Sequence, residues 1–219
     1  MPIALYALGV VVGAPVLTVM TGRWPRKAVL LGLLTTVLGY AGVFTVFTYI
    51  APLLTQVVGF EAAAVSPILL IFGAGMIGGN LIGGRLADRR LAPTVLGVLL
   101  ALAAVLGLMT FVLDSRILTV VFVGLLGAGA FATAAPLQMW VLDKAQGAGQ
   151  SLASSFNIAA FNLGNALGAW LGGVVIARGL GLGAVTWVAA LLPLAAFGVA
   201  LMAIRLEAAQ DLAISDECA

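Results

Sequence analysis

Long apolar runs separated by short polar segments follow one another along this chain. Seven of them reach the length of about 20 residues that a helix needs to cross a membrane. They lie at about 3–21, 29–57, 64–84, 93–113, 117–140, 153–177 and 181–204. Lipid offers no hydrogen-bond partner to a free backbone, and the runs are continuous rather than alternating. The pattern therefore predicts an all-α, polytopic membrane helical bundle of about seven transmembrane helices.

The second apolar run is too long for a single perpendicular crossing. It contains Gly39, Gly42 and Pro52, which are residues that commonly accompany bends in helices. We therefore expect one tilted or kinked helix with an extension towards the far surface.

The composition excludes several classes of protein. Hydrophobic residues make up 63% of the chain and charged residues 8%, against about 25% charged residues in soluble domains. There is no histidine, and Cys218 is the only cysteine, so the commonest metal ligand and general base is missing. No predicted span holds a lysine or an acid that could activate a nucleophile. We expect no enzyme, no cofactor, no metal site and no nucleic-acid partner.

The basic residues predict the orientation in the membrane. Eight of the ten follow the first, third, fifth and seventh spans, namely Arg23, Arg26, Lys27, Arg85, Arg89, Arg90, Lys144 and Arg205. Only Arg116 and Arg178 lie in the intervening loops. Because basic loops stay on the cytoplasmic side, we expect a multi-pass inner (plasma) membrane protein with its N-terminus outside and its C-terminus in the cytoplasm.

A short motif follows the third span. Residues 83–90 read Gly-Gly-Arg-Leu-Ala-Asp-Arg-Arg, which resembles the signature Gly-x-Leu-Ala-Asp-Arg of the major facilitator superfamily. The resemblance implies a cytoplasmic gate loop formed by Gly84, Arg85, Asp88 and Arg89. The glycine would let two helices approach closely, and the aspartate could pair with an arginine or a helix N-terminus in one conformation only. The alternative is an ordinary basic loop that sets the topology.

The rest of the chain extends this resemblance. Residues 34–205 resemble the C-terminal six-helix half of a facilitator of the arabinose-efflux or drug-efflux type, through the segments 40–52, 135–142 and 159–170. Residues 1–27 resemble the second helix of the N-terminal half and its loop, with a weaker echo of the signature at 21–28. The expected organisation is an N-terminal helix and loop over 1–27, a six-helix bundle over 28–205 and a short cytoplasmic tail over 206–219. An internally truncated or fused facilitator and a genuine short paralogue both remain open.

Polar residues within the spans are candidates for a substrate cavity. The candidates are Thr45, Tyr49, Gln138 and Asn157, together with the aromatic residue Phe161. Such groups usually face protein or a water-filled cavity, so the alternative is that they form hydrogen bonds between helices. Glycines that recur every four residues, at 75, 79, 83 and at 164, 168, 172, predict close helix packing.

These observations predict transmembrane transport of a small solute. We expect efflux of a sugar-like or drug-like molecule by a facilitator-type alternating-access mechanism, which needs two bundles around one site. The expected partners are the solute, membrane lipid, and either a second copy of the chain or a partner half-transporter. The alternative is a truncated facilitator remnant, or an accessory membrane bundle without transport activity of its own.

Overall fold

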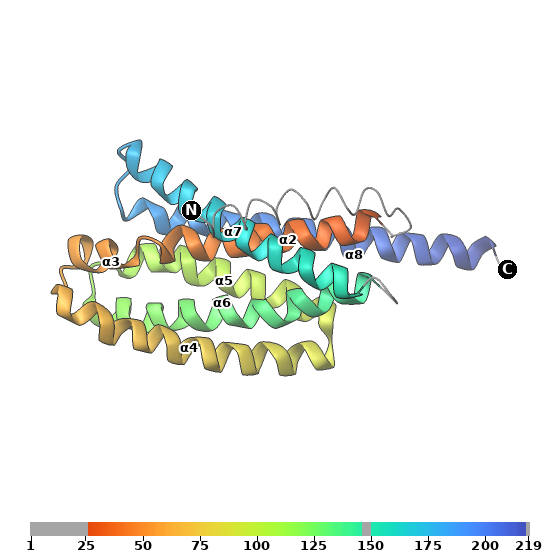
Figure 1. Ribbon diagram of the computed structural model, residues 1–219, viewed down its shortest axis with the longest axis horizontal. Coiled ribbons are helices and arrows are strands. Elements are labelled where there is room, and N and C mark those ends of the chain that lie inside the picture. Colours follow the sequence, from red (N-terminus) through yellow and green to blue (C-terminus); the bar gives the residue numbers. More distant parts are fainter. Residues whose placement is uncertain (1–25, 146–149, 218–219) are drawn as a thin grey trace.

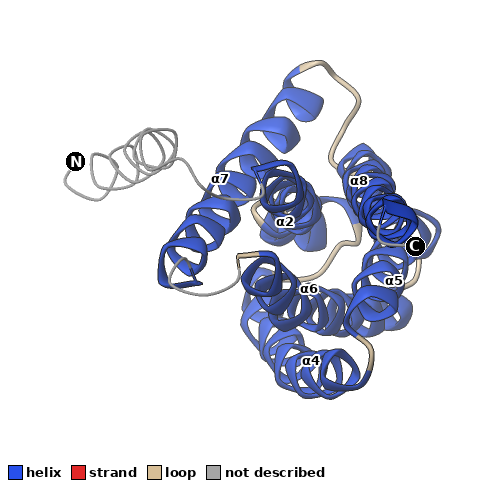
Figure 2. Ribbon diagram, turned by 90° about the vertical axis from the view of Figure 1, so that its right-hand side faces the viewer, coloured by secondary structure: helices blue, strands red, loops and turns tan. Residues whose placement is uncertain are grey.

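The computed structural model describes residues 26–145 and 150–217, which form a bundle of long helices lying side by side (Figures 1 and 2). The long helices are α2 (Arg26–Phe47), α4 (Ala62–Arg89), α5 (Leu91–Val112), α6 (Arg116–Lys144), α7 (Gln150–Ala177) and α8 (Ala184–Glu217). Two short segments follow α2, namely α3 (Ile50–Pro52) and the π-helix η1 (Leu53–Val57). The part of the chain that the structure describes contains no β-strand. The predicted all-α fold class is confirmed.

Each long helix holds a segment that is long and apolar enough to cross a membrane. These six segments correspond to the second to seventh runs expected from the sequence, while the expected span 3–21 lies outside the described residues. The weaker echo of the signature lies at 21–28, and its residues 21–25 are also outside the described part of the chain. Helix α8 continues to Glu217, well beyond the predicted span 181–204. The residues expected as a tail are therefore helical up to Glu217, and α8 projects beyond the other helices in Figure 1.

The long second run is broken near its far end, as its length suggested. Helix α2 ends at Phe47, and the chain resumes as α3 at Ile50. Pro52 has no N–H to donate to the carbonyl of Thr48, and its ring crowds that carbonyl, so the helix cannot continue through this point. Beyond the break, Val58 N donates to Leu53 O at 3.2 Å, which gives the wider turn of a π-helix. The break follows from Pro52 rather than from the two glycines.

Two glycine ladders hold four of the helices at backbone contact. A Cβ atom placed on Gly75, Gly79 or Gly83 of α4 would collide with the backbone of α6 at Gly124, Ala128 and Ala132 respectively. In the same way, Gly164, Gly168 and Gly172 of α7 lie against the backbone of α2 at Val37, Ala41 and Thr45. The predicted role of both glycine series in close packing is confirmed.

The two ladders relate one half of the bundle to the other. Within each ladder the residue numbers rise together on the two helices, so α4 runs parallel to α6, and α2 runs parallel to α7. The two pairs point in opposite directions, because successive spanning helices alternate. Helices α5 and α8 pack against each other, with α6 beside α5 and α2 beside α8. If α2, α4 and α5 are exchanged with α6, α7 and α8 respectively, each of these helix pairs becomes a pair that is also in contact. This correspondence is the pattern of an inverted repeat.

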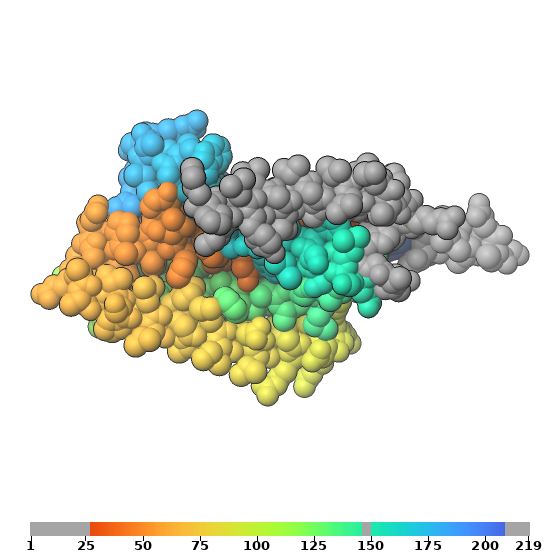
Figure 3. Space-filling model, in the orientation of Figure 1, coloured from red at the N-terminus to blue at the C-terminus, as the bar shows by residue number. Residues whose placement is uncertain are grey.

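Burial differs sharply between helices. Helix α2 lies among α6, α7 and α8 (Figure 2), and its residues Val43 and Val46 are almost completely buried. Helix α4 lies along one side of the bundle (Figure 3) and exposes large apolar side chains, including Leu70 and Ile77. An exposed apolar face of this kind is expected where a helix meets lipid or another membrane helix.

One ion pair joins the end of α6 to the C-terminal part of α8. Lys144 Nζ lies 2.8 Å from Glu207 Oε2 and 3.5 Å from Asp143 Oδ2. The side chains of Lys144 and Glu207 are 19% and 27% exposed, whereas that of Asp143 is 61% exposed. The pair with Glu207 is thus both the shorter and the more shielded from solvent.

Replacing Lys144 with methionine should lower the free energy of unfolding by about 2 kcal/mol, between the values for exposed and for buried ion pairs. The change leaves the Glu207 carboxylate with no cation, and its Oε1 already has no hydrogen-bond partner in the described part of the chain. Asp143→Asn is the control and should change stability by less than about 0.5 kcal/mol. Denaturant unfolding in detergent, followed by circular dichroism, would measure both. Equal effects of the two substitutions would mean that the ion pair of Lys144 with Glu207 stabilises the protein no more than its pair with Asp143.

Candidate functional site

A chain of four hydrogen-bonded polar side chains joins α2, α6 and α7. Thr36 Oγ1 donates to Asn157 Oδ1 at 2.8 Å, and Asn157 Nδ2 donates to Gln138 Oε1 at 2.7 Å. Gln138 Nε2 then donates to Ser154 Oγ at 2.9 Å. Thr36 and Asn157 are fully buried, whereas Gln138 and Ser154 are partly exposed. The structure therefore brings Gln138 and Asn157 together, and only the Gln138–Ser154 end of this polar network is open to a ligand.

Thr45 and Tyr49 lie elsewhere, where α2 meets α7. Thr45 is fully buried and its hydroxyl donates to Ala41 O at 2.7 Å within its own helix. The hydroxyl of Tyr49 donates to Ala169 O at 2.9 Å, and its ring covers Gly172. The Tyr49 hydroxyl thus joins this segment to α7, whereas the Thr45 hydroxyl is satisfied within α2 in this conformation. The structure does not bring these two residues into one group with Gln138 and Asn157.

Phe161 belongs to a row of aromatic rings that crosses from α7 over α2 to α4. Its ring meets Tyr40 edge-on, with centroids 4.3 Å apart. Tyr40 is followed by Phe44 at 6.4 Å, Phe44 by Phe47 at 5.8 Å, and Phe47 by Phe72 of α4 at 4.6 Å. These distances are typical of interacting aromatic pairs. Of these rings only Phe161 was predicted from the sequence to line the cavity, although the spacing of 40, 44 and 47 places three rings on one helix face.

The expected gate residues form the last two turns of α4 rather than a loop. Helix α4 continues through Arg89, and only the extended residue Arg90 separates it from α5. Arg85, Asp88 and Arg89 are all exposed. Within the described residues, no hydrogen bond or ion pair engages the side chain of Asp88. The carboxylate is therefore free to take a partner there, but the pairing that was expected for it is not formed with any residue that the structure describes.

Metal binding finds no support in the part of the chain that is described. No group of three or more histidine, cysteine, aspartate or glutamate side chains there could hold an ion. Its acidic residues lie near helix ends, as Asp88 and Asp143 do, or, like Glu207, in α8 beyond the predicted span 181–204.

A sequence model of the Major Facilitator Superfamily matches residues 41–217, from the last third of α2 to the end of α8. This chain belongs to the Major Facilitator Superfamily. It is 35% identical over 173 residues to the MFS-type transporter YfhI of Bacillus subtilis. It is 40% identical over 156 residues to the inner membrane transport protein YdhP of Escherichia coli O157:H7, and 35% identical over 172 residues to the putative transporter AraJ of Escherichia coli K12.

The resemblance to this superfamily that the sequence motifs indicated is confirmed. The three alignments cover 79%, 71% and 76% of the chain, but only 43%, 40% and 42% of the respective relatives. The chain thus spans about two-fifths of the length of these facilitators. Its six described spanning helices fit the expectation of one half of a facilitator fold.

The close contact between helices that was expected at Gly84, the glycine of the facilitator signature, is found at the neighbouring Gly83. A Cβ atom on Gly84 would meet no other atom within 4 Å, so Gly84 does not mediate a close helix contact. The neighbouring Gly83 does so, because a Cβ there would collide with Ala132 of α6. Among the described residues Gly83, rather than Gly84, therefore lets α4 approach a neighbouring helix, and the expected role of Gly84 in the gate stays a prediction.

Proposed function

We propose that this chain takes part in the transport of a small solute across the inner membrane by alternating access. The observation that carries the proposal is the match of residues 41–217 to the Major Facilitator Superfamily, across six helices that can each cross a membrane. The name of the relative YdhP, an inner membrane transport protein, supports this location. The bias of basic residues supports an N-terminus outside and a C-terminus in the cytoplasm.

The proposed solute is a sugar-like or drug-like molecule, moved by efflux. The resemblance of residues 34–205 to sugar-efflux and drug-efflux facilitators supports this class. The aromatic row around Tyr40 and Phe161 offers apolar ring faces, and Gln138 offers an amide at the open end of the polar network. Thr45, Tyr49 and Asn157 would have to exchange their present hydrogen bonds for bonds to the solute, in a second conformation of the bundle.

Alternating access also needs a second bundle that rocks against this one around the bound solute. We propose that it is supplied by another copy of the chain or by a partner half-transporter. A specific observation favours a second candidate function, since the chain spans only about two-fifths of the facilitators that it matches. On that alternative the chain is a facilitator remnant, or an accessory membrane bundle that moves no solute itself.

Solute flux into proteoliposomes that contain only the purified chain separates the two candidates. The panel holds sugars and amphipathic drugs, each measured with and without a pH gradient, after the orientation of the inserted protein has been checked. Saturable uptake of one class would support transport by an oligomer of this chain. Absence of flux from folded, correctly oriented protein would support the remnant or accessory alternative.

Replacing Asp88 with alanine tests the proposed gate in the same assay. If the Asp88 carboxylate pairs in one conformation only, the initial rate should fall about five-fold or more, the lower end of typical coupling energies between conformations. Asp143→Ala is the matched control, because Asp143 is also an exposed acid near a helix end. Membrane insertion of both variants should equal that of the unaltered chain. Equal rates for the two variants would remove Asp88 from the gate.

A further inference from the structure

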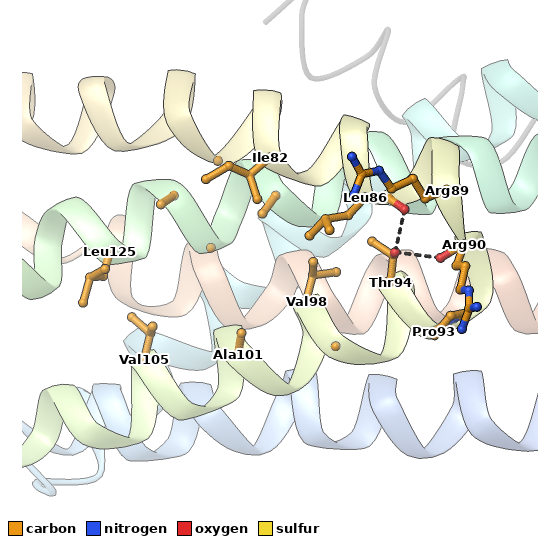
Figure 4. A pocket seen from close by; sticks show the side chains of 15 residues that line it. Ile82, Leu86, Arg89, Arg90, Pro93, Thr94, Val98, Ala101, Val105 and Leu125 are labelled. Carbon is orange, nitrogen blue, oxygen red and sulfur yellow. Dashed lines mark hydrogen bonds between the residues drawn. The ribbon is translucent and has the colours of Figure 1, made fainter.

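An open groove runs between α4 and α5, with α6 as its floor (Figure 4). Its volume is about 700 Å³, which lies within the range of ligand sites in proteins. The walls are apolar over most of its length, with side chains that include Ile82, Leu86, Val98, Ala101, Val105 and Leu125. None of the residues proposed for the solute cavity lines it, and of the expected gate residues only Arg89 does.

Small residues and the short connection between the helices explain why the groove exists. Arg90 alone joins α4 to α5, which holds the two helices together at one end while α6 packs behind both of them. On the α5 wall, Gly97 leaves a space that a side chain would occupy, because a Cβ there would meet no atom within 4 Å.

The polar groups of the groove gather at the end where α4 meets α5. Figure 4 shows Arg89, Arg90 and Thr94 at this end, with Val105 and Leu125 at the other. The hydroxyl of Thr94 is engaged internally, at 2.7 Å from Arg90 O and 3.0 Å from Leu86 O. Arg89 and Arg90 are exposed and have no ion-pair partner within the described residues. Figure 4 shows the Arg89 side chain beside Leu86 and the Arg90 side chain beside Pro93, so an occupant of the groove meets one free cation on each side of this end and hydrocarbon along the rest.

We propose that the groove binds an anionic phospholipid, with its phosphate at Arg89 and Arg90 and an acyl chain along the apolar walls. The groove lies on spanning helices, and arginine near a membrane surface attracts anionic headgroups. A helix of another chain could fill the apolar walls, but it would leave the two guanidinium groups without an anion. This inference needs only that the chain is embedded in a membrane, so it does not depend on solute transport.

The first test measures lipid binding to the purified full chain by native mass spectrometry in detergent. The probes are phosphatidylglycerol, phosphatidylcholine with the same acyl chains, and soluble glycerol 3-phosphate. We expect the chain to retain phosphatidylglycerol at least about five-fold more tightly than phosphatidylcholine, as expected from about 1 kcal/mol for one arginine. Glycerol 3-phosphate should not be retained. Equal binding of this soluble phosphate would instead indicate a free-anion site and overturn the proposal.

Two substitutions then address the two ends of the site. Gly97→Leu fills the open space and favours the helix. It should weaken the binding of both lipids by at least about ten-fold, because several methylene groups of the acyl chain would no longer be buried in the groove. Arg90→Gln should weaken the binding of phosphatidylglycerol by about five-fold and leave the binding of phosphatidylcholine unchanged.

The matched controls lie away from the groove. They are Gly198→Leu, at an exposed glycine where a Cβ would also meet no atom within 4 Å, and Arg205→Gln, at an exposed arginine of α8. Both should bind lipid as the unaltered chain does. Unchanged phosphatidylglycerol binding in both Gly97→Leu and Arg90→Gln would overturn the proposal. So would a dimer of the chain that Gly97→Leu abolishes while lipid binding persists, because the groove would then hold a second copy.

Discussion

Alanine at Gly79 is expected to disrupt the bundle, whereas alanine at the adjacent Gly78 should be tolerated. A Cβ on Gly79 would lie against the carbonyl oxygen, carbonyl carbon and Cα of Ala128. Backbone atoms cannot rotate out of the way as a side chain can, so α4 and α6 would have to separate along the whole ladder. The expected loss is about 3 kcal/mol or more of unfolding free energy, at the upper end of the usual cost of overpacking.

Gly78 provides the matched control on the next position of the same helix. A Cβ there would meet no atom within 4 Å, and alanine is favoured over glycine inside a helix by roughly 0.5–1 kcal/mol. Thermal unfolding in detergent and the fraction of monodisperse protein on size-exclusion chromatography would measure both variants. Equal stability of Gly78→Ala and Gly79→Ala would mean that α4 and α6 do not meet at backbone contact.

The pattern of apolar runs was sufficient to predict the described helices, because membrane thickness dictates how long each apolar segment must be. It could not predict their ends, since helices such as α4 and α8 continue past the apolar segment with charged residues. The spacing of glycines predicted the two ladders. It could not show that Gly83 is packed and Gly84 free, because that depends on which face of α4 meets α6.

Less of the candidate site could be predicted from the sequence, because its contacts join residues that are far apart in the chain. Gln138 and Asn157 were both selected as polar groups within spans, but Thr36, which is 121 positions before Asn157, was not. The periodic rings at 40, 44 and 47 were visible on one helix face, whereas the contact of Phe47 with Phe72 depends on how α2 and α4 pack. A single sequence holds no record of such pairings between helices.

Replacing Asn157 with alanine should cost about 2 kcal/mol of unfolding free energy. The substitution removes the hydrogen bonds from Thr36 and to Gln138, and each such bond between membrane helices contributes roughly 0.6 kcal/mol, and up to about 1.7 kcal/mol. It also leaves the Gln138 carbonyl oxygen without this donor, which adds a desolvation penalty. Thermal unfolding in detergent would measure the loss, and solute flux in proteoliposomes would be followed in parallel.

Asn162→Ala is the matched control, because this residue lies on the same helix but is exposed and, among the described residues, its side chain bonds only to Ile158 O in its own helix. It should leave stability within about 0.5 kcal/mol of the original, as is usual for surface substitutions. A loss of stability confined to Asn157→Ala would show that the polar network holds α2, α6 and α7 together. Unchanged stability combined with lost flux would instead indicate that the polar network binds the solute, since a group that binds the solute affects transport without being needed for packing.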